Sequence, residues 1–138
     1  MSAIAKTAEA FFTACETGKG WEACKVYCTP DATFAAQAGM LAEVRSLAVY
    51  TDWIKDMFGP FPDGRYEVKA FATDEQRGNV CAYAVYTGSH TGPGAPVAPT
   101  GKTVVTDYVY VMQFSDGRIS HMTKIWNDGF ALKQVGWG

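Results

Sequence analysis

The stretch from Thr103 to Asn127 reads TVVTDYVYVMQFSDGRISHMTKIWN. Its two arms are dense in Val, Tyr, Thr and Ile, residue types that favour β-strands. Asp116-Gly117 stands between the arms, and Asp-Gly between two such runs is a strong hairpin signal. The stretch therefore predicts two antiparallel strands, 103–114 and 117–127, joined by a tight turn.

Two further runs of strand-forming residues, 65–73 and 79–91, precede this hairpin. A segment rich in Gly and Pro, 91–100, separates the second run from the hairpin and predicts a flexible loop. The sequence between residue 65 and residue 127 is thus expected to form four strands in succession.

The first half of the chain has the period of helices, because apolar residues recur there at steps of three and four. The segments with this spacing are 3–17, 20–28 and 44–58. Thr29-Pro30-Asp31 predicts a turn, with Asp31 as a turn or cap residue, that leads into a short strand over 31–35.

Helices first and a long sheet afterwards are typical of the α+β class. We expect one domain over residues 1–138, in which a curved antiparallel or mixed sheet wraps around the N-terminal helices. Such a sheet forms a cone with an interior cavity.

Charge and composition argue against several classes of function. The net charge is −2 and no cluster of Lys or Arg occurs, so nucleic acid is not expected as a partner. No apolar run is long enough to span a membrane, and the first residues lack the pattern of a secretory signal. A cytoplasmic protein is therefore predicted.

The cysteines and glycines give no sign of a bound cofactor. Cys24 and Cys28 are four residues apart, but no second Cys/His pair of suitable spacing completes a metal site. No Gly-rich phosphate loop lies between a strand and a helix. We expect structural thiols, no metal and no other cofactor.

Five short motifs occur in order along the second half of the chain. They are Phe61-Pro62-Asp63, Gly88-Ser89-His90-Thr91-Gly92, Pro99-Thr100-Gly101-Lys102, Asp116-Gly117-Arg118-Ile119 and Leu132-Lys133-Gln134-Val135-Gly136. With these motifs the chain resembles the SnoaL-like polyketide cyclases, within the superfamily named for nuclear transport factor 2. The helical half matches that family in pattern only.

The resemblance implies a mechanism in which an Asp on the last strand is the general base of an aldol ring closure. A His on the preceding strand lines the same cavity. The Asp position falls on Lys124 and the His position on Tyr110, so the family's base is missing here. Ketosteroid isomerase belongs to the same superfamily, and its three site residues match Phe12, Ala36 and Tyr110. None of these positions keeps the ketosteroid isomerase chemistry unless Tyr110 donates in place of the protonated Asp, so the chain is expected to be neither a standard cyclase nor an isomerase of that type.

Strand alternation sorts the last hairpin into two faces. Residues predicted to share the cavity face with Tyr110 and Lys124 are Tyr108, Met112, Phe114, Ser120, Met122 and Trp126. The opposite face holds Val109, Val111, Ile119, His121, Thr123 and Ile125. That face is also apolar, which predicts that a second copy covers it in a homodimer.

Lys124 and Tyr110 are the candidate catalytic residues. Lys124 has three possible roles, namely an amine that forms a Schiff base, a cation that binds an enolate or carboxylate, and a general base. The alternative is a Lys paired with an acid such as Asp128, its stem covering the apolar wall. Tyr110 either donates a hydrogen bond to a ligand oxygen or fills the cone with its ring.

The remaining candidates would bind the apolar part of a ligand. They are Phe12, Trp53, Phe58, His90, Met112, Met122 and Trp126. Core packing is the alternative for the Met and aromatic residues, and a structural or exposed His is the alternative for His90. His121, on the outer face, is expected to have no chemical role.

These observations predict a protein that binds a small hydrophobic molecule bearing a carbonyl or carboxylate. It would act on that molecule as a lyase, isomerase or cyclase, with a site rebuilt around Lys124 and Tyr110. Two alternatives stay open on the same fold. One is a non-catalytic ligand-binding module, and the other is a dimeric interaction module whose cavity is filled by side chains.

Overall fold

The computed structural model describes all residues, 1–138, as a curved five-stranded sheet with helices against it. In chain order the elements are α1 (Ala3–Glu16), α2 (Trp21–Cys24), the 3₁₀ turn η1 (Lys25–Tyr27), β1 (Cys28–Ala36), the 3₁₀ turn η2 (Gly39–Leu41), α3 (Leu47–Met57), β2 (Arg65–Asp74), β3 (Asn79–Ser89), β4 (Thr103–Ser115), β5 (Arg118–Trp126) and α4 (Asp128–Val135). Each predicted helix and strand has a counterpart in the structure, and the largest differences lie between residues 20 and 31.

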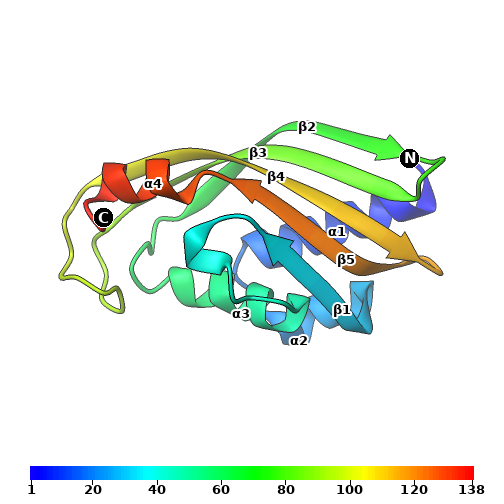
Figure 1. Ribbon diagram of the computed structural model, residues 1–138, viewed down its shortest axis with the longest axis horizontal. Helices are drawn as coiled ribbons and strands as arrows, with labels where there is room; N and C mark the ends of the chain where they lie inside the picture. The colour runs from blue at the N-terminus through cyan, green and yellow to red at the C-terminus, as the bar shows by residue number, and fades with distance from the viewer.

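The strands lie in the order β1-β5-β4-β3-β2, and only β1 runs parallel to its neighbour. The other three pairings are antiparallel. Helices α1, α2 and α3 lie together on one side of the bent sheet, and α4 lies near one end of it (Figure 1). The sheet does not close on itself, and the predicted α+β cone is confirmed.

The two long helices begin at serine caps. The side chain of Ser2 accepts a hydrogen bond from the backbone N–H of Ala5, and that of Ser46 from Val49, which satisfies amides that a helix start leaves free. No helix of the structure is long and apolar enough to cross a membrane.

The core fills the space between α1, α3 and the concave face of the sheet. Its main cluster contains 19 buried residues, which include Phe11 and Phe12 from α1 and Tyr50 from α3. A smaller cluster at the end near α4 joins Phe61 and Val104 with two α4 residues, Ala131 and Val135. The segment after β3 is held close there, since a Cβ on Gly92 would lie 1.9 Å from the carbonyl oxygen of Gly59.

The β4–β5 turn forms as predicted, with positive φ angles at Asp116 (51°) and Gly117 (80°). The predicted faces are wrong at two positions beyond it. The register shifts between Gln113 and Phe114, so Ile119 pairs with Phe114 and lies in the core. Ser120 is displaced from the concave face because a bulge interrupts the two-residue period.

The C-terminal helix α4 was not expected from the sequence. Asn127 caps its start through a bond from the Phe130 amide, and Gly136 ends it in the left-handed conformation. Gln134 accepts a hydrogen bond from the backbone N–H of Val105 and donates one to its carbonyl. It thereby satisfies part of β4 that extends beyond its pairing with β5.

The segment around Asp31 also differs from its prediction. The structure places Asp31 inside β1, which starts at Cys28 rather than at residue 31. The pairing with β5 shifts between Cys28 and Thr33, so the Pro30 region accommodates a bulge instead of a turn. The predicted helix over 20–28 is likewise shorter, because Cys28 is already extended.

Replacement of Ile119 by Ala tests the corrected face assignment. Because Ile119 is fully buried, Ile119→Ala should lower the free energy of unfolding by about 2–5 kcal/mol. The control is Val49, which is exposed on α3. Val49→Ala should change the free energy of unfolding by less than about 0.5 kcal/mol. Urea unfolding measures both values, and equal small effects would place Ile119 on the outer face.

Candidate functional site

A pocket opens at the end of the cone where α3, α4 and the strands β3, β4 and β5 meet. Seventeen residues line it, of which 14 are hydrophobic. The hydrophobic ones are Met40, Trp53, Ile54, Met57, Phe58, Phe61, Tyr86, Val104, Tyr108, Trp126, Ala131, Leu132, Val135 and Trp137. The polar ones are Glu16, Thr106 and Lys124, and the cavity volume is about 80 Å³.

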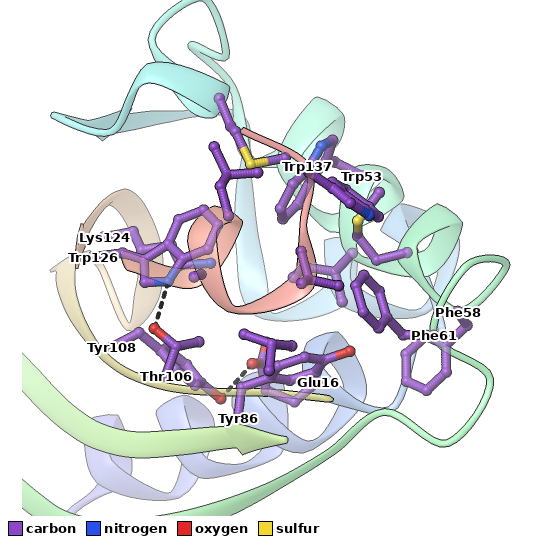
Figure 2. Close-up of a pocket in the computed structure, with 17 residues that line it drawn as sticks. Glu16, Trp53, Phe58, Phe61, Tyr86, Thr106, Tyr108, Lys124, Trp126 and Trp137 are labelled. Carbon is purple, nitrogen blue, oxygen red and sulfur yellow. Dashed lines mark hydrogen bonds between the residues drawn. The ribbon is translucent and has the colours of Figure 1, made fainter. Parts of the chain in front are cut away.

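The close-up of the pocket shows two opposed walls (Figure 2). Glu16, Tyr86 and Tyr108 lie on one side, and Trp53 and Trp137 lie on the other (Figure 2). The Trp126 indole N–H donates to the hydroxyl of Thr106 at 3.0 Å, which fixes the orientation of the indole. A few polar groups in a mainly apolar wall are typical of sites for small molecules.

Lys124 projects from β5 to the pocket and is only 6% exposed. Its ammonium lies 4.4 Å from the ring centroid of Trp126, 5.1 Å from Tyr50 and 5.4 Å from Trp53. It donates a hydrogen bond to the Tyr50 hydroxyl at 2.8 Å. No carboxylate oxygen lies within 4.0 Å of it, and Asp128 instead accepts from the amide of Met40.

Glu16, at the last residue of α1, is the acid of this pocket and is 8% exposed. One carboxylate oxygen accepts from the Tyr108 hydroxyl at 2.6 Å and the other from the Tyr110 hydroxyl at 2.8 Å. Two hydroxyl donors from β4 thus hold the carboxylate in place beside the pocket.

A continuous chain of hydrogen bonds joins Lys124 to Glu16. Because Tyr110 gives its only hydroxyl proton to Glu16, the bond between Tyr50 and Tyr110 must have Tyr50 as its donor. The Tyr50 oxygen then accepts from Lys124. The chain therefore runs in one direction, from the ammonium through two hydroxyls to the carboxylate.

Burial sets the protonation of the groups in this chain. Desolvation lowers the pKa of Lys124 to about 8, while the charge of Glu16 acts in the opposite direction. Desolvation also raises the pKa of Tyr50 and Tyr110 well above 10, and the Glu16 charge adds to this effect. At neutral pH Lys124 is thus largely cationic, and both tyrosines keep their protons.

The predicted site residues separate into two layers. Trp53, Phe58 and Trp126 line the pocket together with Lys124. The others occupy the core next to it, fully or almost fully buried and outside the lining, and they are Tyr110, Phe12, Met112 and Met122. Tyr110 reaches the site only through its hydrogen bonds with Tyr50 and Glu16.

His90 lies outside the pocket lining, fully buried behind Phe61 and Trp137. Its Nδ1 accepts from the Trp137 indole at 3.0 Å and from the Thr100 amide at 3.3 Å. Nδ1 is therefore unprotonated, and the ring proton belongs on Nε2, which has no partner. His90 orients Trp137, whose ring forms part of the pocket wall.

Sequence reasoning missed Glu16 and the role of Tyr50 in the hydrogen-bond chain. Glu16 lies four residues after Phe12, so it continues the buried stripe of α1 that contains Ala5, Ala8 and Phe12. An acid at a core-facing helical position was the signal that could have identified it. The same reasoning does not find Trp137, because helix α4, which precedes it, was not predicted.

The arrangement combines a buried ammonium, a buried carboxyl group and a chain of hydrogen bonds between them. It can hold an oxygen of a bound molecule against Lys124 while Glu16 accepts or returns a proton. No group of three or more His, Cys, Asp or Glu side chains is placed to hold a metal ion, and all four cysteines are free.

Comparison with known families and structures agrees with this architecture. The model of the SnoaL-like polyketide cyclase family matches residues 6–135. A search of curated proteins finds no significant match.

Three solved structures illustrate the shared fold. IdmH of Streptomyces antibioticus, described as a candidate polyketide cyclase, is 21% identical with a TM-score of 0.78 over 96% of this chain and 98% of that one. A nuclear transport factor 2-like protein of Burkholderia thailandensis is 15% identical, with a TM-score of 0.75 over 97% and 98%. An LEH-like epoxide hydrolase of Mycobacterium tuberculosis is 14% identical, with a TM-score of 0.67 over 99% of this chain and 91% of that one.

The pH dependence of stability tests the burial of Lys124. Its folded pKa is lowered from 10.5 to about 8, so the unfolded chain binds more protons between these values and stability rises with pH. From pH 7 to pH 9.5 this rise should amount to about 2 kcal/mol, and it should disappear in Lys124→Met. Urea unfolding over this range measures the difference between the two proteins.

The exposed Lys6 provides the matched control for this measurement. Lys6→Met should keep the wild-type pH profile, because its side chain already lies in water. If the free energy of unfolding of Lys124→Met rose with pH as it does in the wild type, Lys124 would not be the buried group that causes the rise.

Proposed function

Since this chain belongs to the SnoaL-like polyketide cyclase family, we propose that it binds a small, largely apolar molecule through a carbonyl or carboxylate oxygen at Lys124. It then acts on that molecule by proton transfer, as a lyase, isomerase or cyclase. The single observation that carries this proposal is the buried ammonium of Lys124, which has no carboxylate within 4.0 Å and borders an apolar pocket.

The polarity of the pocket supports a ligand with an electron-rich oxygen. An ammonium in an apolar wall is unfavourable unless an anion or a dipole meets it. Within the chain Lys124 has one hydroxyl acceptor and several aromatic faces as partners. A carbonyl or carboxylate oxygen would be a stronger partner, whereas a ligand without one would gain only apolar contact.

The volume supports a ligand with a narrow reactive end. A cavity of about 80 Å³ holds only a few heavy atoms, less than the roughly 300–1,000 Å³ of most drug-sized sites. A linear chain with its oxygen at Lys124 and its tail along Trp53 and Phe58 fits these limits better than a fused ring system.

Glu16 supports the catalytic part of the proposal. The family resemblance implies an Asp base at the position of Lys124, and the buried carboxylate of this pocket comes from α1 instead. A carboxylate and an ammonium that line one pocket can remove a proton from a carbon and stabilise the resulting enolate.

A non-catalytic ligand-binding module is the second candidate. It is favoured by the filling of the deep cone, where Tyr110, Phe12, Met112 and Met122 are almost completely buried. This packing leaves room for a ligand only at the mouth.

We also propose a homodimer through the outer face of the sheet. Helices α1, α2 and α3 lie on the other side of the sheet (Figure 1), and the apolar residues of this face include Tyr83 (36% exposed), Val105 (48%) and Ile125 (59%). Val109 and Val111 lie beside them, half-buried. A second copy on this face would bury a patch that a monomer leaves in water.

Ligand affinity tests the role of Lys124. Hexanoate should bind to the wild type more tightly than hexan-1-ol, and Lys124→Met should lose about 10- to 100-fold in hexanoate affinity with little change for the alcohol. Quenching of tryptophan fluorescence reports binding, since Trp53, Trp126 and Trp137 line the pocket.

The matched control for this titration is Lys102→Met, which removes an exposed lysine outside the lining. It should bind hexanoate as the wild type does. Equal hexanoate affinity in Lys124→Met and the wild type would remove Lys124 from the binding site.

Light scattering tests the proposed dimer. The protein should have twice the 15.0 kDa mass of the chain, and Ile125→Glu should yield a folded monomer, because a charge at the centre of an apolar contact is poorly solvated. Val49→Glu, on the helical side, is the control and should stay dimeric. A wild-type monomer at micromolar concentration would contradict the interface.

A further inference from the structure

We propose that Lys124 is a covalent site that forms an imine with an aldehyde or ketone, and that Tyr50 and Tyr110 carry its proton to Glu16. The inference deepens the proposed function and rests on it in one respect, namely that the pocket admits a carbonyl compound. It assigns the substrate class and a chemical role for the hydrogen-bond chain.

Attack on a carbonyl needs an amine that is accessible from the pocket and free of a fixed acid partner. Lys124 meets both conditions, because it lines the cavity and makes no ion pair. The rings of Trp126, Tyr50 and Trp53 exclude water around its stem and limit the directions from which a ligand arrives. An iminium in the same place would keep these aromatic faces as partners.

Attack also needs a route by which the ammonium loses a proton. Lys124 donates to Tyr50 at 2.8 Å, Tyr50 donates to Tyr110, and Tyr110 donates to Glu16 at 2.8 Å. A shift of one proton along each bond leaves a neutral amine at one end and a neutral carboxylic acid at the other. Both tyrosines are neutral before and after the shift, so neither passes through a stable phenolate.

The reaction balances without an oxidant or a reductant. The amine lone pair forms the C–N bond as the carbonyl π bond opens onto its oxygen, and that oxygen takes the proton that the attacking nitrogen loses, which gives the neutral carbinolamine. Loss of that oxygen as water, with the proton that Glu16 returns through the chain, breaks the C–O bond and leaves the iminium. Overall, one ammonium and one carbonyl group become one iminium and one water.

Other titratable groups near Lys124 would not replace Glu16 as the proton acceptor. The groups that face it are Glu16 and Cys15 from α1, Tyr50 from α3, and Tyr108 and Tyr110 from β4. Burial raises the pKa of Cys15, Tyr50, Tyr108 and Tyr110. These groups therefore keep their own protons, and Glu16 is the one carboxylate among the groups that face Lys124.

Reductive trapping tests the imine. The full-length protein is mixed with hexanal near pH 7.5, treated briefly with borohydride, digested and mapped by mass spectrometry. We expect a hexyl adduct on Lys124 that forms roughly tenfold or more faster than on any other lysine, because Lys124 lines the pocket and burial lowers its pKa to about 8. Hexan-1-ol, which has no carbonyl, should give none.

Variants of the chain separate a proton route from simple electrostatics. The Glu16 charge raises the pKa of Lys124, so Glu16→Gln would increase the neutral amine and speed trapping if Glu16 acted only as a charge. With a proton route, Glu16→Gln and Tyr110→Phe should both slow it by about tenfold or more. Glu9→Gln, exposed on the same helix, is the matched control and should trap as the wild type does.

Lys124→Arg keeps the cation but forms no stable imine, so it should bind hexanoate and give no adduct. Adducts on surface lysines alone, together with normal hexanoate binding, would overturn the imine and leave the proposed function intact. If the folded wild type neither binds hexanoate nor gives an adduct on Lys124, both the imine and the proposed function are overturned. Faster trapping in Glu16→Gln would overturn the proton route.

Discussion

An ammonium group that is buried without a carboxylate beside it constrains the whole interior of this protein. Lys124 keeps its charge in an aromatic enclosure only because a hydroxyl accepts its hydrogen bond and a second hydroxyl passes that polarity on to Glu16. Each link comes from a different element, with Lys124 on β5, Tyr50 on α3, Tyr110 on β4 and Glu16 on α1. Displacement of any one of them leaves a buried polar group unpaired, which typically destabilises a protein by about 1–3 kcal/mol or more.

The sheet provides the register that this chain requires. Tyr110 and Lys124 are direct cross-strand partners, and Ala36 on β1 is the partner of Lys124 on the other side. The small side chain of Ala36 leaves space beside Lys124, and α3 brings Tyr50 into that space. The Tyr50 ring stacks on Phe34, with 4.2 Å between the two ring centroids. Curvature of the sheet over the helices therefore does two things at once, since it closes the core and places four polar groups in one line.

Periodicity predicted much of this arrangement and failed where the backbone departs from it. The alternation of β4 and β5 placed Tyr110, Lys124 and Trp126 on one face, and the helical spacing of α3 brought Trp53 and Phe58 forward as pocket residues. A strict two-residue alternation does not reveal a bulge. The prediction therefore put Ile119 on the outer face and Ser120 on the cavity face, which is the wrong way round. Glu16 looked like an ordinary charge at a helix end, and only the three-dimensional meeting of α1 with β4 gives it two tyrosine donors. The short helix α4 has only eight residues and contains a glycine, so it is too short to show a clear helical period.

The departure from the family pattern then has a physical interpretation as an exchange of charge positions. The resemblance implies a carboxylate on the last strand, where this chain has an ammonium, and the carboxylate of this pocket comes from the first helix instead. The site therefore still contains one acid. The charge that a ligand meets at β5, however, is positive instead of negative. An electron-rich oxygen is attracted to the position from which a family member's Asp would repel it. If the proposed function holds, a substrate would enter with its carbonyl toward β5 and its acidic C–H toward α1, the reverse of the order that the family's base implies.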